Sequence, residues 1–305
     1  MGKKQDAAKK EAKKQRAEAK QKKSSTKKQK KELNERGEPD IETILAEIRA
    51  MEEDEKAVSE MAVEKIYPRS SALFVANPAK EGEFFVHGGE CYDGQKTSVY
   101  RDLMRLRVEK KEWAVIKMPN SPPPRSGHHG VAYKEFIYLF GGEFTSPTGM
   151  QFYHYHDTWR LDTKEMAWEN VTCKRGPQAR SGHRMVVWKQ YIYTFGGFYD
   201  NGRDVKYFND LWRFDTVAMK WEEIKFVAGS MLPTERSGCV LFVHGDNLFV
   251  WGGYCKVTKK AESESGLVHT DMWCCRLSAD MCQWERVKKS GRAPGPRSGC
   301  AFVYQ

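Results

Sequence analysis

The chain has 305 residues, of which 40% are hydrophobic and 12% aromatic, so it holds enough large apolar side chains for a sizeable core. This composition excludes a wholly disordered protein, and no apolar run approaches the roughly 18 residues that span a bilayer. The formal net charge is +10, and most of this excess lies near the N-terminus. Because no apolar leader opens the sequence, we expect an intracellular protein of the cytoplasm or nucleus, with no membrane partner.

The first segment, residues 1–31, carries 14 Lys and Arg against 3 acidic residues and almost no apolar side chains. Ala, Lys and Gln favour helix, but this Lys-rich tail has no apolar face to pack, so we expect it to be disordered. Lysine attracts phosphate whatever the base sequence, which makes weak contact with RNA or with an importin one hypothesis. A purely solubilising role is the alternative.

Residues 32–66 form an acidic linker with 12 acidic residues against 4 basic ones. Asp40 can cap a short amphipathic helix, and four apolar residues then follow the spacing of one helix face: Ile41, Ile44, Leu45 and Ile48. The acidic run that begins at Glu52 opposes the helix dipole, so the helix should end there. Its apolar stripe should pack either within this chain or on a partner.

From residue 67 to the end, one unit repeats: an Arg-Ser pair, a Gly-Gly pair, an Asp and a Trp, in that order. The arginines are Arg69, Arg125, Arg180, Arg236 and Arg297. The glycine pairs are Gly88 and Gly89, Gly141 and Gly142, Gly196 and Gly197, and Gly252 and Gly253. The tryptophans are Trp113, Trp168, Trp221 and Trp284. A regular period of about 55 residues indicates a repeat architecture.

Within residues 180–226, four short runs rich in β-branched and aromatic residues are typical of strands: SGHRMVVW, YIYTFGG, NDLWRFDT and KWEEIKF. Four-stranded units repeated at this period predict an all-β propeller of stacked blades. Each glycine pair ends the second strand, where the missing Cβ permits a sharp turn or a close backbone approach. The Trp of each fourth strand should fill the wedge between neighbouring blades. These repeated glycines and tryptophans are therefore interpreted as structural.

With these motifs the sequence resembles the kelch-repeat proteins, and most closely the family of kelch domain-containing protein 4. GGECYDGQKTSVYRDL, GGEFTSPTGMQFYHYHDTW and RSGHRMVVWKQYIYTFGGF are close to that family's first three blades, and the MGKK start and the following helix also resemble it. The resemblance implies about six blades and a charged C-terminal region. Residues 67–305 hold four units and the first strand of a fifth, SGCAFVY. We therefore expect an incomplete, C-terminally truncated kelch propeller with open apolar edges.

Catalytic or metal-binding chemistry has little support in the residues. His128-His129 and His154-Tyr155-His156 are the best metal candidates, but His183 and then a cysteine take the place of His128 in later units, which indicates an interchangeable strand position. The eight cysteines include no CxxC pair, and no GxGxxG, P-loop or GxSxG motif appears. We expect no enzymatic activity, no cofactor and no metal.

The stretches between each glycine pair and the following Asp are long and rich in aromatic residues. In a propeller they connect second to third strands on one face, and loops on a rigid scaffold commonly carry function. Tyrosine suits interfaces through its apolar body and polar tip. The expected partner-binding residues are Tyr92, Phe144, Phe152, Tyr153, Tyr155, Tyr199, Tyr207 and Tyr254. About half of the loop aromatics should instead pack inward.

Four of the repeated arginines begin the innermost strands of the second to fifth units: Arg125, Arg180, Arg236 and Arg297. A ring of guanidinium groups there would suit an acidic peptide or a terminal carboxylate. The alternative is that each Arg makes fixed bonds within the scaffold. Regular repetition favours this alternative, because ligand sites are usually asymmetric.

These observations favour a non-enzymatic protein–protein interaction module, a kelch propeller that binds a partner protein through its inter-strand loop face. One alternative is a substrate-recognition adaptor of a ubiquitin ligase, although no BTB domain or cullin-box segment is recognisable. Another is an RNA-associated protein that acts through residues 1–31.

Overall fold

The computed structural model describes residues 37–52, 57–259, 263–278 and 281–302. The predicted helix is present as α2, Ile41–Glu52. Asp40 caps it as expected, because its carboxylate accepts a hydrogen bond from the Glu42 N–H at 3.1 Å and its carbonyl accepts those of Thr43 and Ile44. The predicted disordered tail, residues 1–31, lies outside the described residues.

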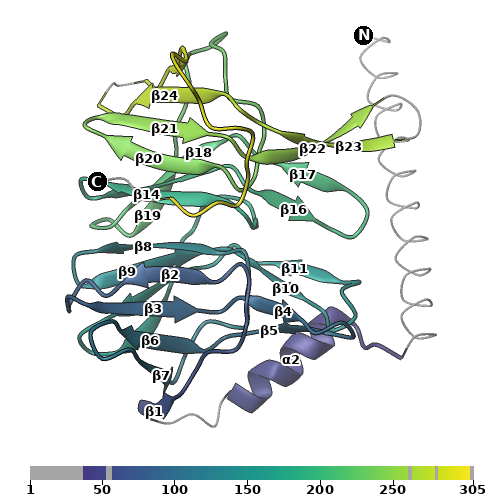
Figure 1. Cartoon of the computed structure of the whole chain (residues 1–305), viewed down its shortest axis with the longest axis vertical. Helices are drawn as coiled ribbons and strands as arrows, with labels where there is room; N and C mark the ends of the chain where they lie inside the picture. The colour runs from purple at the N-terminus through teal and green to yellow at the C-terminus, as the bar shows by residue number, and fades with distance from the viewer. Residues whose placement is uncertain (1–36, 53–56, 260–262, 279–280, 303–305) are drawn as a thin grey trace, which may run out of the picture. The chain divides into compact units, whose positions relative to one another are not determined.

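Four antiparallel sheets follow, one for each sequence repeat, and we call them blades 1 to 4 (Figure 1). Blade 1 contains β2 Leu73–Ala76, β3 Glu83–His87, β6 Leu103–Arg107 and β7 Glu112–Lys117. Blade 2 contains β8 His129–Tyr133, β9 Phe136–Phe140, β12 Thr158–Asp162 and β13 Ala167–Val171. Blade 3 contains β14 Arg184–Trp188, β15 Tyr191–Phe195, β18 Leu211–Asp215 and β19 Lys220–Glu223. Blade 4 contains β20 Val240–His244, β21 Asn247–Trp251, β24 Met272–Arg276 and β25 Trp284–Arg286.

The stretches expected to be loops between second and third strands are themselves short two-stranded sheets, which we call ribbons 1 to 4. They are β4 Glu90–Tyr92 with β5 Thr97–Val99, β10 Glu143–Thr145 with β11 Phe152–His154, β16 Phe198–Asp200 with β17 Val205–Tyr207, and β22 Tyr254–Lys259 with β23 Ser263–Val268. All four project from the same side of the blades (Figure 1), and β5 lies against β10, as β11 does against β16. We call this side the ribbon face.

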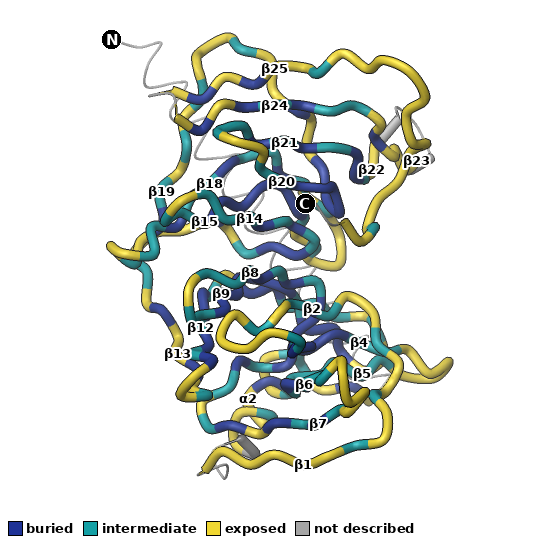
Figure 2. Tube along the Cα trace, turned by 60° about the vertical axis from the view of Figure 1, so that its left-hand side comes forward, coloured by how far each residue is buried: buried dark blue, intermediate teal, exposed yellow. Residues whose placement is uncertain are grey.

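The core lies in the wedges between consecutive blades, where the tube of Figure 2 is mostly buried. Trp168, Trp221 and Trp284 each pack against the last residue of the second strand of the preceding blade, at ring distances of 5.1 to 5.6 Å. These three indoles are 7%, 5% and 2% exposed. All three therefore lie between neighbouring blades. Trp113 in blade 1 is only half-buried, because no blade precedes it among the described residues.

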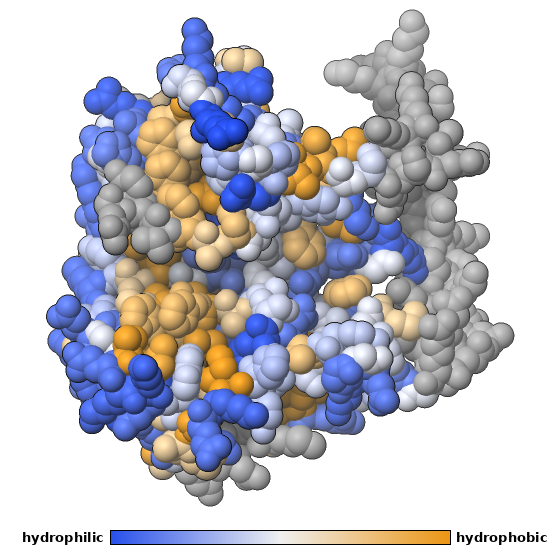
Figure 3. Space-filling model, in the orientation of Figure 1, coloured by the Kyte–Doolittle hydropathy of each residue, from blue (hydrophilic) through white to orange (hydrophobic). Residues whose placement is uncertain are grey.

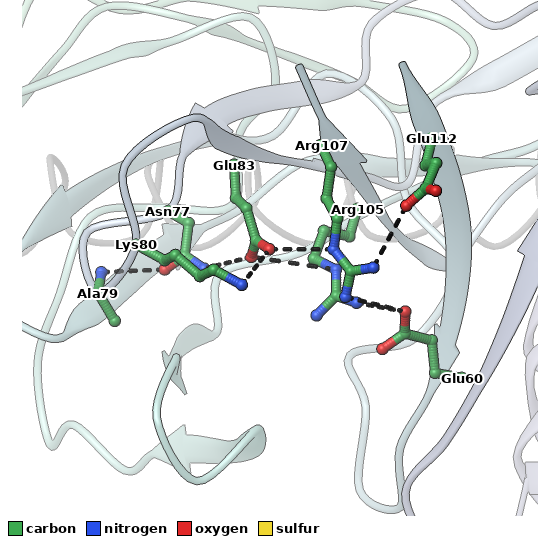
Figure 4. A network of polar contacts seen from close by, with 8 residues as sticks. All are labelled: Glu60, Asn77, Ala79, Lys80, Glu83, Arg105, Arg107 and Glu112. Atoms are coloured by element: carbon green, nitrogen blue, oxygen red, sulfur yellow. Dashed lines mark hydrogen bonds and ion pairs between the residues drawn. The ribbon is translucent and has the colours of Figure 1, made fainter. Parts of the chain in front are cut away.

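Blade 1 has a fifth strand that the sequence did not indicate. Strand β1, Ser59–Val63, falls in the predicted linker and pairs antiparallel with the outer edge of β7. A polar network on the same sheet, shown in Figure 4, contributes to this attachment. Glu60 of β1 forms an ion pair with Arg105, and Glu83 is 4% exposed and bonds Arg107 at 3.2 Å. Burial opposes ionisation of Glu83, but Lys80, Arg105 and Arg107 outweigh it and lower its pKa.

The expected first strand of a fifth blade stays a prediction, because the first strands of blades 2 to 4 begin four residues after the repeated Arg, and here only Ala301 and Phe302 of that stretch are described. The segment still lies where earlier units begin, because Gly299 donates to the Gly238 carbonyl at 2.8 Å and the Phe302 ring lies 5.2 Å from Phe242. Apolar side chains gather over β2 and β3 and over β20 and β21 (Figure 3), and Phe74 is 60% exposed there.

Candidate functional site: the ribbon face

The repeated arginines form a buried frame beneath the ribbons. Arg180 is fully buried; its Nη1 donates to the Gly196 carbonyl at 3.0 Å and to Asp210 Oδ1 at 2.6 Å, and its Nη2 donates to Asp210 Oδ2 at 2.8 Å. Its Nε donates to the Gln178 carbonyl, and its guanidinium lies 4.0 Å from the centre of the Phe208 ring. The same pairing with an Asp recurs three times: Arg69 with Asp102, Arg125 with Asp157, and Arg236 with Asp271. We call these four pairs the Arg–Asp frame.

The Arg–Asp frame corrects the hypothesis of an acidic-ligand ring. Arg125, Arg180 and Arg236 are all fully buried, and their bonds to carboxylates and carbonyls direct them into the scaffold rather than toward a ligand. Arg297 differs, since it is exposed and lies 5.8 Å from the centre of the Trp251 ring. The geometry therefore supports the structural alternative for the three buried arginines. The pairing also lowers the pKa of the acidic partner. At Asp271, burial raises the pKa, but the hydrogen bonds from Arg236 and Trp273 outweigh burial and lower the pKa to about 2.

A chain of backbone hydrogen bonds, which we call the hub, joins the inner ends of consecutive blades. Gly182 donates to Gly127, Gly238 donates to Gly182, and each bond is 2.8 Å long. The glycine pairs belong to the same arrangement, since the Arg236 carbonyl accepts the N–H of Gly197 at 2.9 Å. Gly196 has φ of +70°, and a Cβ there would lie 2.5 Å from the Arg236 carbonyl oxygen. The glycine pairs are thus required both by backbone conformation and by close approach.

The structure divides the eight predicted partner-binding aromatics into three groups. Tyr92 and Tyr199 are 67% and 37% exposed. Four others are half-buried: Phe152, Tyr153, Tyr207 and Tyr254. Phe144 and Tyr155 are buried at 5% and 4% exposure, so the prediction is wrong for these two as surface contacts. The ring of Tyr155 lies against the Arg125 guanidinium at 4.1 Å, and its hydroxyl donates to the Pro124 carbonyl at 3.0 Å, which explains its burial.

The residue directly after each glycine pair was expected to be functional only in the fourth unit, where it is Tyr254. Its backbone is fixed in every unit by a two-way bridge of 2.8 to 3.0 Å to the Ser of the Arg-Ser pair. Its side chain differs from unit to unit: Glu90, Glu143, Phe198 and Tyr254. We call this the variable position. Aligning the four internal repeats on their glycine pairs would have revealed it, because the two residues before it are glycines in every unit.

Ribbons 1 to 3 bring three carboxylates together, which we call the carboxylate cluster: Glu90, Glu143 and Asp200. His154 lies beside it, with Nε2 accepting the Asp200 N–H at 2.9 Å and lying 3.3 Å from Glu143 Oε2. Its Nδ1 lies 2.9 Å from Ser181 Oγ. Burial, and then the charges of Glu90 and Asp200, raise the pKa of Glu143 to about 8. Burial lowers the pKa of His154 to about 4, so the imidazole is neutral near pH 7.

Of the other predicted metal candidates, His128 lies deep between blades, His129 is half-buried and His156 is exposed. His87 Nδ1 and His128 Nε2 are 3.1 Å apart, and burial lowers the pKa of His87 to about 3. His183 takes the equivalent place at the next junction and packs against Phe140 at 5.3 Å. Within the described ranges, no group of three or more His, Cys, Asp or Glu side chains is arranged to hold a metal ion. Their burial and their ring contacts indicate a packing role for His128 and His183.

Comparison with known proteins agrees with this architecture. A family model described as the KLHDC2/KLHL20/DRC7 Kelch-repeats domain matches residues 70–305. Human kelch domain-containing protein 3 is 27% identical over 176 residues, which are 55% of this chain and 44% of that protein. Tip elongation aberrant protein 1 of Schizosaccharomyces pombe is 30% identical over 197 residues, which are 63% of this chain and 16% of that protein. The chain thus spans less than half the length of each of these two relatives.

A solved structure supports the fold. The structure of YjhT has a TM-score of 0.56 and 15% sequence identity, and the match covers 76% of this chain and 68% of that one. None of the helices in the described residues is long and apolar enough to cross a membrane. From the four blades, the Arg–Asp frame and the match over residues 70–305 together, the chain belongs to the KLHDC2/KLHL20/DRC7 Kelch-repeats domain family.

Proposed function

We propose that this chain is a non-catalytic interaction module that binds a segment of a partner protein across the ribbon face. The observation that carries the proposal is the contrast between a constant scaffold and a variable surface. The Arg–Asp frame and the hub recur from blade to blade, whereas the variable position and the ribbons differ. Side chains that change on a fixed backbone suit recognition of an asymmetric ligand.

Two further observations support this proposal. Kelch-repeat domains are typically protein-binding, and their relatives are generally non-catalytic. The exposed Tyr92 and Tyr199 also lie on ribbons 1 and 3, and tyrosine is enriched where interfaces derive most of their energy. We also propose a closer kinship with kelch domain-containing protein 4, because the stretch 141–159, which contains ribbon 2, resembles that family in sequence. The ubiquitin-ligase and RNA hypotheses stay predictions, and residues 1–31 lie outside the described residues.

The test compares partner recovery by the full chain and by a Tyr92→Ala/Tyr199→Ala variant, using affinity purification and quantitative mass spectrometry at two salt concentrations. The matched control is Val217→Ala, which removes an apolar side chain that is 72% exposed in the turn between β18 and β19. We expect the double variant to lose its partners and the control to retain them, with both melting temperatures close to that of the wild type. Full recovery by a folded double variant would contradict binding through the ribbon face.

A further inference from the structure

We propose that the partner segment presents a cationic side chain, lysine or arginine, to the carboxylate cluster of Glu90, Glu143 and Asp200. This inference rests on the proposed function and specifies the chemistry of its partner.

The first argument is the convergence of three acids from three blades. Thr145 Oγ1 of ribbon 2 donates to Glu90 Oε2 of ribbon 1 at 3.2 Å. His154 of ribbon 2 accepts the Asp200 N–H of ribbon 3 and lies 3.3 Å from Glu143. The bonds between ribbons thereby hold these three residues near one another, and the charges of Glu90 and Asp200 both act on Glu143. Glu90 and Glu143 occupy the variable position of their units, and Asp200 lies two residues beyond it in the third.

The second argument is the missing counter-charge. Within the described part of the chain, neither Glu90, Glu143 nor Asp200 forms an ion pair with Lys or Arg. The one contact of this kind joins Glu143 to His154, and the His154 Nε2 is occupied as an acceptor and carries no proton. Elsewhere the chain pairs buried and half-buried acids with Arg, as at Glu83 and in the Arg–Asp frame. The cluster is therefore a set of acidic groups without a cationic partner, and the raised pKa of Glu143 means that its carboxyl is protonated near pH 7 until a cation binds beside it.

The third argument is an unpaired hydroxyl beside the same carboxylate. Ser126 Oγ is fully buried and has no hydrogen-bond partner. Ser126 and Glu143 are directly opposed in an antiparallel bridge, so their side chains lie on the same side of it. The three equivalent serines do have partners, at 2.9 to 3.4 Å: Ser70, Ser181 and Ser237. A buried hydroxyl without a hydrogen-bond partner is costly. Among the four serines, the hydroxyl that lacks a partner is that of Ser126, which lies beside Glu143.

An ammonium or guanidinium group would meet both needs. It supplies positive charge to the carboxylates and N–H donors to the oxygens of Glu143 and Ser126. Tyr199, whose ring lies 4.9 Å from that of His154, offers an aromatic surface at the edge of the cluster for the cation or its aliphatic stem. An acidic segment would add a further negative charge to an unbalanced site and would be rejected.

The experiment selects peptides from a phage-displayed random dodecapeptide library on the full chain at moderate salt. The enriched peptides are synthesised, and their affinity is measured by fluorescence polarisation. We expect enrichment in Lys or Arg, and at least tenfold weaker binding to a Glu90→Gln/Glu143→Gln variant. Glu109→Gln is the control, because it removes a carboxylate from an exposed turn of blade 1. Replacing the critical Arg of a peptide by citrulline, its neutral isostere, should weaken binding to the wild type but not to the double variant.

The outcomes separate this inference from the proposed function. Enriched peptides without basic residues that lose affinity for Tyr92→Ala/Tyr199→Ala would overturn the inference and leave the function standing. Basic peptides that bind the wild type and Glu90→Gln/Glu143→Gln equally would also overturn the inference. Peptides indifferent to both sets of variants, or no enrichment at all, would count against both. Melting temperatures of every variant show whether a loss of binding reflects a loss of fold.

Discussion

The Arg–Asp frame makes a strong prediction about stability, and Arg180→Met tests it. The substitution keeps an unbranched apolar stem but removes the guanidinium, which makes two bonds to Asp210 and one each to the Gly196 and Gln178 carbonyls. Removing one partner of a buried ion pair costs about 3–5 kcal/mol, because the other charge is left uncompensated. Asp210 retains 27% side-chain exposure, so water softens this penalty and we expect the lower end of that range, about 3 kcal/mol.

The assay is thermal unfolding followed by calorimetry. For a domain of this size, a loss of about 3 kcal/mol corresponds to a fall in melting temperature of roughly 6–12 °C. Arg175→Met, which removes an exposed Arg close in sequence, should change stability by no more than about 0.5 kcal/mol. Adding Asp210→Asn to Arg180→Met should restore part of the stability, because the stranded carboxylate is then neutral.

Two results would refute the reasoning. If Arg180→Met has the same melting temperature as the Arg175→Met control, the buried guanidinium does not stabilise the blade. A ligand-binding role for the repeated arginines would then have to be considered again. If the double variant is less stable than Arg180→Met alone, the penalty does not arise from an unpaired Asp210. In that case the bonds of Arg180 to the two backbone carbonyls carry the effect.

Two further predictions concern the wedges and the glycine pairs. Burial lowers the pKa of His87 to about 3, against 6.5 in the unfolded chain. Because the unfolded chain therefore binds the proton more readily, the free energy of unfolding falls by up to about 1.4 kcal/mol per pH unit as the pH drops below 6.5. His87→Phe, which copies the Phe140–His183 pair of the next junction, should flatten this pH dependence in urea unfolding, and an unchanged slope would contradict it. Gly196→Ala should lower the melting temperature far more than Gly229→Ala: both have positive φ, but only Gly196 would place a Cβ 2.5 Å from a backbone oxygen.

The blades were predictable because their signals are local. Short β-rich runs, a glycine pair and a Trp lie within each unit of about 55 residues, so every blade can be read from its own segment. Strand β1 carries no such signal, since four of the five residues of SEMAV are exposed and neither alternation nor burial marks them. It is a strand because the edge of β7 offers unpaired backbone groups and Arg105 offers a charge to Glu60. Such a pairing depends on tertiary structure that local patterns do not encode.

The candidate site was only partly predictable for a related reason. Composition identified the ribbons as aromatic, but it could not show which way each ring points. Tyr155 is buried because it lies against the Arg125 guanidinium, and Tyr100 and Phe208 lie in the same way against Arg69 and Arg180. Aligned repeats would have marked this position as part of the frame. The carboxylate cluster was missed because its members come from three units that only the folded chain brings together.

The division between frame and variable position explains why the repeat signature says so little about the partner. The bridge between the Arg-Ser serine and the variable position uses only backbone N–H and C=O groups, at 2.8 to 3.0 Å in all four units. The geometry of the bridge therefore does not depend on the side chain at the variable position. This side chain is Glu in blades 1 and 2 and aromatic in blades 3 and 4, and the backbone bridge is the same in all four. Such a site can change its ligand chemistry at small cost to the fold. Partner chemistry should therefore follow from these few side chains, and the proposed lysine or arginine ligand follows from two of them being Glu90 and Glu143.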